Sequence, residues 1–208
     1  MLPIVAMCAL ACTPLASAAF RVTVAPISKA QRAAMTPSVW RAGCPVGLNQ
    51  LRAVTATHHD FAGNDRTGTL IVNQDAATAT ATALRKMYAA GIPIRKMRPI
   101  EAYGGDDWKS IEDDNTSAFN CRKATGGGNW SNHAYGRAID INPIENPYVT
   151  SGGSVAHTAS VKYITRTAGP GIATPGSPIV KIFTDLGWGW GGTWSGTKDY
   201  QHFSARGR

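Results

Sequence analysis

Two segments of the chain contain the side chains best suited to bind a metal ion and to move protons. The first contains His133 and Asp140, and the second, near the end of the 208-residue chain, contains Asp199 and His202. Two imidazoles and one carboxylate are ligands that suit zinc. Three protein ligands leave a fourth position for water, which is typical of catalytic rather than structural zinc. The residue types therefore indicate a zinc site on His133, Asp140 and His202.

The spacing within the first segment requires a reversal of the chain. On one extended strand His133 and Asp140 would lie roughly 23 Å apart, too far to share an ion. Gly136 lies between them and can adopt the positive φ that a reversal often needs. Asp140 stands in an alternating strand between Ile139 and Ile141, where a buried carboxylate without a partner is unfavourable. A bound metal would remove that penalty.

Asp199 is the candidate for proton transfer. It lies three residues before His202, and positions three apart on a regular strand face opposite sides, so a bend is needed for both to reach one site. A carboxylate beside a zinc-activated water can take its proton and pass it to the leaving amine. The remaining histidines, His58, His59 and His157, are not expected to bind the catalytic metal.

The hydrophobic patterns predict the elements that must position these residues. No internal repeat or heptad is present. The spacing of hydrophobic residues and the positions of turn residues predict strands over residues 68–73, 92–100 and 137–142, and a last short strand near His202. They predict helices over 76–90 and 178–186. The polar, glycine-rich stretch 103–130 is predicted to be a long functional loop. We therefore expect an α+β fold with a small central antiparallel sheet, flanking helices and long active-site loops.

The N-terminal 18 residues resemble an export signal. They contain no charged side chain, they are largely apolar, and they end in a small-x-small pattern at Ala16 and Ala18. The alternatives are a buried N-terminal helix and a lipid anchor at Cys12. We predict a signal peptide at 1–18, an N-terminal extension at 19–43 and a domain at 44–208 that contains the candidate zinc site. The protein is thus expected to be secreted or to lie in the cell envelope, without a membrane span.

The cysteines and the charge agree with that location. Removal of the signal leaves Cys44 and Cys121, which are expected to form a disulfide worth roughly 3–5 kcal/mol; two buried free thiols are the alternative. The 21 basic and 13 acidic residues give a net charge of +8, which suits contact with anionic wall polymers. Because the basic residues are scattered and not interleaved with aromatics, we expect no nucleic-acid binding.

The motif S-x-H-x-x-G-x-A-x-D at residues 131–140, followed by D-x-x-H at 199–202, resembles the zinc D-alanyl-D-alanine carboxypeptidases and the related phage L-alanyl-D-glutamate endopeptidases. The likeness extends from about residue 44 to residue 203. It implies zinc on His133, Asp140 and His202, a catalytic base at Asp199, and an upstream arginine that steadies the substrate. Arg122 matches that arginine best, with Arg98 as its rival. An Asp as the base is closer to the phage endopeptidases than to relatives that use Glu.

The resemblance implies a zinc metallopeptidase domain at 44–208 whose substrates are peptidoglycan stem peptides. With the predicted export signal, we expect a secreted protein, and we expect it to be a monomer. The bond that it cuts stays open between the D-Ala-D-Ala bond of a carboxypeptidase and an L-Ala-D-Glu or other endopeptidase bond. The alternative from another class is a catalytically inactive, zinc-containing cell-wall-binding module. Such a module is expected to lack the catalytic base, and Asp199 is present.

Overall fold

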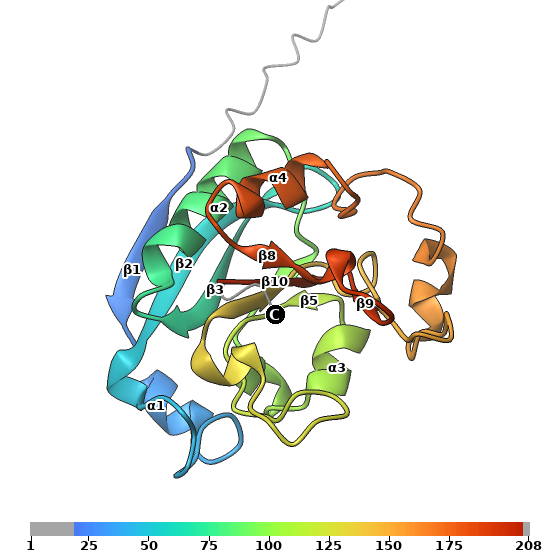
Figure 1. Cartoon of the computed structure of the whole chain (residues 1–208). Coiled ribbons are helices and arrows are strands. Elements are labelled where there is room, and N and C mark those ends of the chain that lie inside the picture. The colour runs from blue at the N-terminus through green and yellow to red at the C-terminus, as the bar shows by residue number, and fades with distance from the viewer. Residues whose placement is uncertain (1–18, 206–208) are drawn as a thin grey trace, which may run out of the picture.

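The computed structural model describes residues 19–205 of the chain (Figure 1). The predicted signal peptide and the alternative lipid anchor at Cys12 lie outside the described residues. Within residues 19–205, no helix combines the length and the apolar character needed to cross a membrane. The fold consists of small, mostly antiparallel sheets with helices beside them, so the predicted α+β class is confirmed.

The first sheet has three antiparallel strands in the order β1 (Val22–Pro26), β2 (Leu51–His59) and β3 (Asp65–Asn73). Helix α2 (Ala77–Ala89) packs on one face, where Leu84 and Met87 join a core with Leu70 (Figure 1). Helix α1 (Lys29–Met35) contributes Met35 to a second core on the other side. The predicted strand 68–73 and helix 76–90 are confirmed, whereas β1 and β2 are not among the predicted strands.

The second sheet is also antiparallel, in the order β6 (Ala138–Asp140), β10 (His202–Ser204) and β8 (Gly189–Trp190). Helix α4 (Pro178–Thr184) covers it, and the ring of Phe183 stacks on that of Phe203 at 4.4 Å. The side chains of this sheet share one hydrophobic core with β2, β3 and α2. The two sheets and their helices therefore form a single packed unit.

Two pairs of very short strands complete the fold. β4 (Lys96–Met97) pairs in parallel with β5 (Asn115–Thr116), and β7 (Tyr148–Val149) pairs antiparallel with β9 (Lys198–Asp199). The prediction of a strand over 92–100 is wrong for most of its length, because prolines at 93 and 99 lack the backbone N–H that a ladder needs. The prediction of a loop over 103–130 is also incomplete, since this stretch contains β5 and helix α3 (Asp107–Glu112).

Short 3-10 helices connect these elements. They are η1 (Leu48–Gln50), η2 (Ile100–Tyr103), η3 (Asn132–Tyr135), η4 (Thr158–Tyr163) and η5 (Gly191–Thr193). The first precedes β2, the third precedes β6, and the fifth follows β8. The turns of η3 and η5 thus lie next to the strands of the second sheet.

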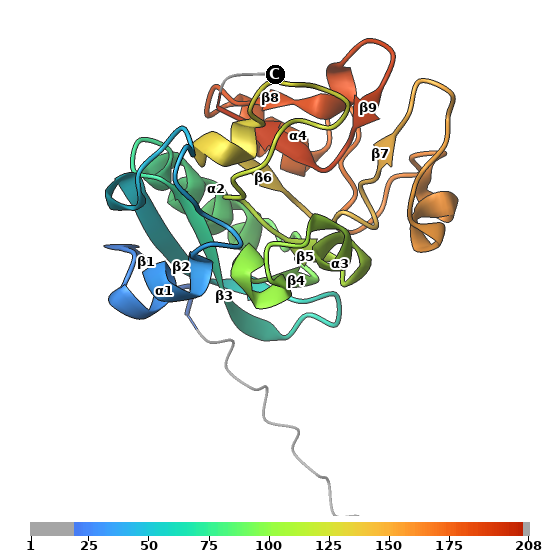
Figure 2. The same ribbon diagram turned by 90° about the horizontal axis from the view of Figure 1, so that it is seen from below.

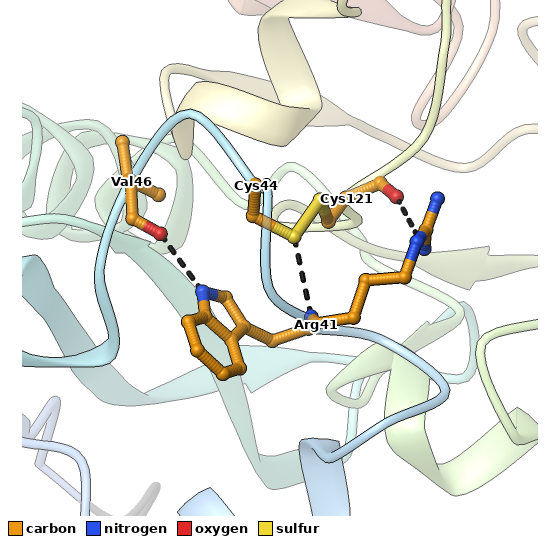
Figure 3. The surroundings of a disulfide bond; sticks show 5 residues. Arg41, Cys44, Val46 and Cys121 are labelled. Carbon is orange, nitrogen blue, oxygen red and sulfur yellow. Dashed lines mark hydrogen bonds between the residues drawn. A yellow bond between two sulfur atoms is a disulfide. The ribbon is translucent and has the colours of Figure 1, made fainter.

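The predicted disulfide between Cys44 and Cys121 is present and joins residues 77 positions apart (Figure 3). The guanidinium of Arg41 donates a hydrogen bond to the carbonyl of Cys121 at 3.1 Å, and the indole of Trp40 donates to the carbonyl of Val46 at 2.8 Å. The disulfide therefore fixes the chain immediately before Arg122 to the segment that follows α1.

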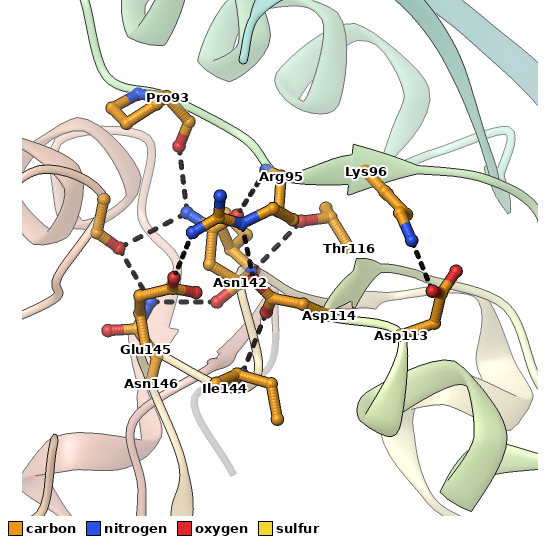
Figure 4. Close-up of polar contacts among 12 residues, drawn as sticks. Pro93, Arg95, Lys96, Asp113, Asp114, Thr116, Asn142, Ile144, Glu145 and Asn146 are labelled. Atoms are coloured by element: carbon orange, nitrogen blue, oxygen red, sulfur yellow. Dashed lines mark hydrogen bonds and ion pairs between the residues drawn. The ribbon is translucent and has the colours of Figure 1, made fainter. Parts of the chain in front are cut away.

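A polar network joins β4 and β5 to the turn that follows β6 (Figure 4). The side chain of Asn142 accepts from the backbone N–H of Arg95 at 3.0 Å. The guanidinium of Arg95 pairs with Asp114 at 3.2 Å and with Glu145 at 2.8 Å. Burial and the neighbouring Glu145 carboxyl raise the pKa of Asp114 to about 7. This network fixes the turn that begins directly after Asp140, the last residue of β6.

Candidate metal centre

His133, Asp140 and His202 meet in one buried group. His133 Nε2 lies 3.1 Å from Asp140 Oδ2, and His202 Nδ1 lies 3.1 Å from Asp140 Oδ1. The same two imidazole nitrogens are also 3.1 Å apart. Each of the three residues is at most 5% exposed. Among residues 19–205, this is the group of His, Cys, Asp and Glu side chains whose ligand atoms converge closely enough to hold a metal ion.

The register of the second sheet brings two of the three residues together. His202 on β10 lies directly opposite Asp140 on β6. Residues directly opposite each other in an antiparallel pair have Cβ atoms about 5 Å apart, so their side chains reach the same point. The carboxylate and one imidazole are therefore positioned by backbone pairing in the core of the molecule.

The third residue, His133, arrives on the 3-10 turn η3. The hydroxyl of Ser131 caps this turn by accepting from the backbone N–H of His133 at 3.2 Å. Gly136 ends it with a φ of +65° and returns the chain into β6. The predicted reversal between His133 and Asp140 is thus confirmed. A Cβ on Gly136 would lie 2.6 Å from the backbone nitrogen of Asn73, so glycine is needed here for space as well as for conformation.

The hydrogen bonds and charges around the three residues favour the binding of a cation. His133 Nδ1 lies 2.6 Å from the carbonyl of Ala118, so this nitrogen carries the proton and Nε2 keeps a lone pair directed at Asp140 and His202. Burial lowers the pKa of His133, but the Asp140 carboxylate outweighs burial and the net pKa is raised. Burial acts to raise the pKa of Asp140, and the imidazoles outweigh it, so this pKa lies well below its ordinary value.

Asp199 lies at the end of β9, where Tyr148 of β7 is its partner across the ladder. The chain turns at residues 200–201 before β10 begins at His202, so the predicted bend between Asp199 and His202 is present. The indole of Trp190 donates to the carbonyl of Tyr200 at 2.8 Å and holds this turn. Burial, and then the nearby Asp140 carboxylate, raise the pKa of Asp199 to about 6.

Arg122 reaches the same site from the strand-like segment after the disulfide. Its backbone carbonyl accepts from the N–H of Ser131 at 3.1 Å, so the segment runs beside the start of η3. Its guanidinium pairs with Asp107 of α3 at 3.0 Å. The rival arginine, Arg98, lines a different cavity, beside the β2–β3 turn.

A cavity of about 340 Å³ opens beside the metal group, and Arg122, His133, Asp199 and His202 all line it. The structure thus brings together every predicted site residue, with Asp140 buried behind the two imidazoles. The nearby tryptophans have different locations. Trp188 and Trp190 are in the core, whereas Trp194 lines the cavity with its ring 5.4 Å from that of His202. Three other residues of the site were not predicted from the sequence to take part in it: Ala118, Asp107 and Tyr148.

The other histidines lie outside the metal group. His59 pairs with Asp65 at 3.1 Å, and His157 pairs with Glu112 at 2.6 Å. His58 is buried on β2, and burial lowers its pKa.

Comparison with protein families supports the resemblance of the motifs. Residues 125–205 match the model of a family described as D-alanyl-D-alanine carboxypeptidase. The match contains His133, Asp140, Asp199 and His202, and it begins three residues after Arg122. Searches of curated proteins and of solved structures give no match. Over residues 125–205 the predicted family is therefore confirmed, and the metal group in this segment agrees with the predicted metallopeptidase class.

Proposed function

Because residues 125–205 belong to the D-alanyl-D-alanine carboxypeptidase family, we propose that the protein is a secreted zinc peptidase that cuts a peptide bond in peptidoglycan stem peptides. The observation that carries this proposal is the convergence of two buried imidazoles on one buried carboxylate beside a cavity. The bond is that of a D-Ala-D-Ala carboxypeptidase or of an L-Ala-D-Glu type endopeptidase.

The donor set and its spacing fit zinc. Ligand atoms that share a tetrahedral zinc at about 2.0 Å lie about 3.3 Å from one another. The three distances of 3.1 Å between the ligand atoms of His133, Asp140 and His202 agree with that value. The Ala118 carbonyl supplies the outer hydrogen bond that metal-binding histidines usually make. A zinc ion held there would polarise a substrate carbonyl and acidify a water molecule.

The residues of the chain supply the proton transfer and the positioning. We assign Asp199 as the general base, since a pKa of about 6 leaves its carboxylate ionised yet basic enough to accept a proton near neutral pH. It takes a proton from the attacking water and returns it to the leaving amine. Arg122 faces the same cavity, and we assign it to hold the developing oxyanion or a substrate carboxylate.

The proposed location outside the cytoplasm rests on the disulfide and on the apolar N-terminal segment. Disulfides persist in oxidising compartments and are rare in the cytosol. The Cys44–Cys121 bond is therefore what an exported protein is expected to contain.

Mass spectrometry of purified stem peptides after digestion tests the proposal and identifies the bond. We expect a single new cleavage that requires zinc and disappears with a chelator. An inactive cell-wall-binding module would leave every peptide intact while the protein still carries zinc and binds purified cell wall.

A further inference from the structure

A second cavity of about 340 Å³ lies beyond the metal group. Arg122, Thr125, Tyr148 and Asp199 line both cavities, so the two adjoin at the proposed base and the proposed substrate-binding arginine. The second cavity extends between α3 and the segment that follows β7. Figures 1 and 2 both place these two elements on the same side of the molecule.

Apolar side chains form much of the wall of the second cavity. Trp108 of α3 is 55% exposed although it is large and apolar. Its ring packs against that of His157 at 4.0 Å, and His157 is held in turn by the carboxylate of Glu112 at 2.6 Å. Further apolar lining comes from Ile111, Pro143, Pro147, Val155 and Ala156. Such a wall offers a braced aromatic surface to a ligand.

Two buried polar side chains in the lining each have an oxygen without a hydrogen-bond partner within residues 19–205. They are Ser160, which is 1% exposed and is unpaired at Oγ, and Gln201, which is 5% exposed and is unpaired at Oε1. Oδ1 of Asp199 is likewise buried and unpaired. Buried polar atoms in native proteins are nearly always hydrogen-bonded, and an unpaired one costs about 1–3 kcal/mol. Gln201 Oε1 and Asp199 Oδ1 are acceptors, and the hydroxyl oxygen of Ser160 can also accept, so a ligand with N–H donors would satisfy them.

The charges at the cavity disfavour an anionic ligand. Arg122 already pairs with Asp107 at 3.0 Å, and both side chains are only about a third exposed, at 27% and 33%. The charge of the guanidinium is therefore largely offset on the side of the second cavity. Asp107 and Asp199 would both repel a substrate carboxylate there.

From these observations we propose that the second cavity is a subsite for an uncharged, amide-bearing residue of a peptide substrate. Arg122 and Asp199 lie between this substrate residue and the metal group. The substrate residue packs on Trp108 and donates N–H groups to Gln201 and Ser160. The inference rests on the proposed peptidase function. It adds that the substrate fills a cavity on each side of the base, so that the favoured substrate extends in both directions from the scissile bond.

Steady-state kinetics on the zinc-loaded protein test the subsite. The probes are a synthetic stem peptide with amide-linked residues on both sides of the scissile bond, and two shorter peptides truncated on one side or the other. Trp108→Ala should raise KM for the long peptide about tenfold, with kcat within about twofold. One truncated peptide should show no difference between this variant and wild type. Val24→Ala is the matched control, since Val24 is an exposed apolar residue on β1, at 47%, outside the cavity.

Ser160→Ala separates a binding role from a structural one. Removing a buried, unpaired hydroxyl should leave the melting temperature unchanged or raise it. The same change should raise KM for the long peptide, because the bound peptide loses a partner. A lowered melting temperature together with an unchanged KM would give Ser160 a purely structural role and count against the subsite.

Two further outcomes decide the inference. If Trp108→Ala affects all three peptides equally, or no more than Val24→Ala does, the subsite is overturned. If wild type cleaves none of the peptides, the proposed function fails, and binding of the long peptide is measured directly by calorimetry. Weaker binding in Trp108→Ala than in Val24→Ala would still support the subsite, whereas equal binding would overturn it.

Discussion

Asp140 and Asp114 are both buried carboxylates, yet their surroundings shift their pKa values in opposite directions. Asp140 lies between two imidazoles, which keep its pKa well below the ordinary value. Asp114 lies beside Glu145, and burial together with this second carboxyl raises its pKa to about 7. Asp114 also forms an ion pair with the guanidinium of Arg95, whose Nε lies 3.2 Å from Asp114 Oδ2 (Figure 4).

The difference shows what distinguishes a candidate metal site from a structural polar network. At Asp140 the neighbours are ring nitrogens with lone pairs, so the group lacks a permanent cation and suits a metal ion. At Asp114 the guanidinium of Arg95 already occupies the place of the cation. Convergent carboxylates alone therefore do not indicate a metal; the identity of the neighbouring donors does.

The largest expected effect is the loss of the metal when both imidazoles are removed. His133→Ala combined with His202→Ala leaves one carboxylate, so we expect less than about a tenth of the wild-type zinc content and no measurable peptidase activity. Metal analysis by mass spectrometry checks this. Glu145→Gln, in the network around Asp114, is the control that should keep its zinc. Wild-type zinc in the double variant would rule out the proposed ligand set.

Removal of the proposed substrate-binding arginine should have the next largest effect. Arg122→Ala should lower kcat/KM by about 10²–10³-fold, which is typical for the loss of one oxyanion donor, while zinc content stays unchanged. Arg98→Ala is the matched control, because Arg98 lines another cavity. A larger loss in Arg98→Ala than in Arg122→Ala would mean that the two arginines have been assigned the wrong way round.

We expect Gly136, which ends the turn that positions His133, to tolerate no side chain. In Gly136→Ala the new Cβ meets the backbone of β3 and the positive φ is disfavoured, so the free energy of unfolding should fall by about 2–5 kcal/mol. Urea unfolding with and without a chelator measures this change. Gly128→Ala is the control, since its Cβ would meet nothing within 4 Å and its φ is not positive. Equal stability of the two variants would contradict the close approach of η3 to β3.

The smallest expected effect concerns the pH dependence of stability. Folding raises the pKa of Asp114 to about 7, so the protonated Asp114 carboxyl favours the folded state. This contribution to the free energy of unfolding is fully present below about pH 4 and is lost as pH rises through 7. Asp114→Asn mimics the protonated carboxyl, and Asn tolerates the positive φ of 51° at this position. Above pH 7 the variant should therefore be more stable than wild type, by on the order of 1–3 kcal/mol.

Chemical unfolding of both proteins at pH 5 and pH 8 checks this prediction. We expect the stability difference between variant and wild type to grow from pH 5 to pH 8. A difference that is the same at both pH values would mean that Asp114 is ionised in the folded protein throughout this range.

The sequence was sufficient for the residues whose roles depend on local chain geometry. The helix over 76–90 has an apolar face with helical spacing, and Gly91 ends it with a φ of +65°. The reversal at Gly136 follows from the distance between His133 and Asp140, and the disulfide follows from the count of cysteines. In each case a short spacing or a small set of partners leaves few alternatives.

The parts that could not be predicted depend on distant residues. Asp107 is paired with Arg122 only because α3 folds against that segment, and α3 lies in a stretch whose glycines and polar residues are typical of a loop. The prolines at 93 and 99 interrupt a stretch whose apolar alternation favours a strand. Strand β2 combines threonines and histidines, so its burial becomes evident only when β1 and β3 pair with it.

One comparison of two variants tests the central claim most directly: the zinc content and the turnover of Asp199→Asn beside those of Asp140→Asn. If Asp199 moves protons and Asp140 binds the metal, Asp199→Asn keeps about one zinc per chain and loses about 10²–10⁴-fold in kcat. Asp140→Asn then loses both zinc and activity, because a neutral amide replaces the anionic ligand. Loss of zinc from Asp199→Asn with retention in Asp140→Asn would show that the two roles are reversed. Full activity of zinc-loaded Asp199→Asn would contradict the proposed mechanism.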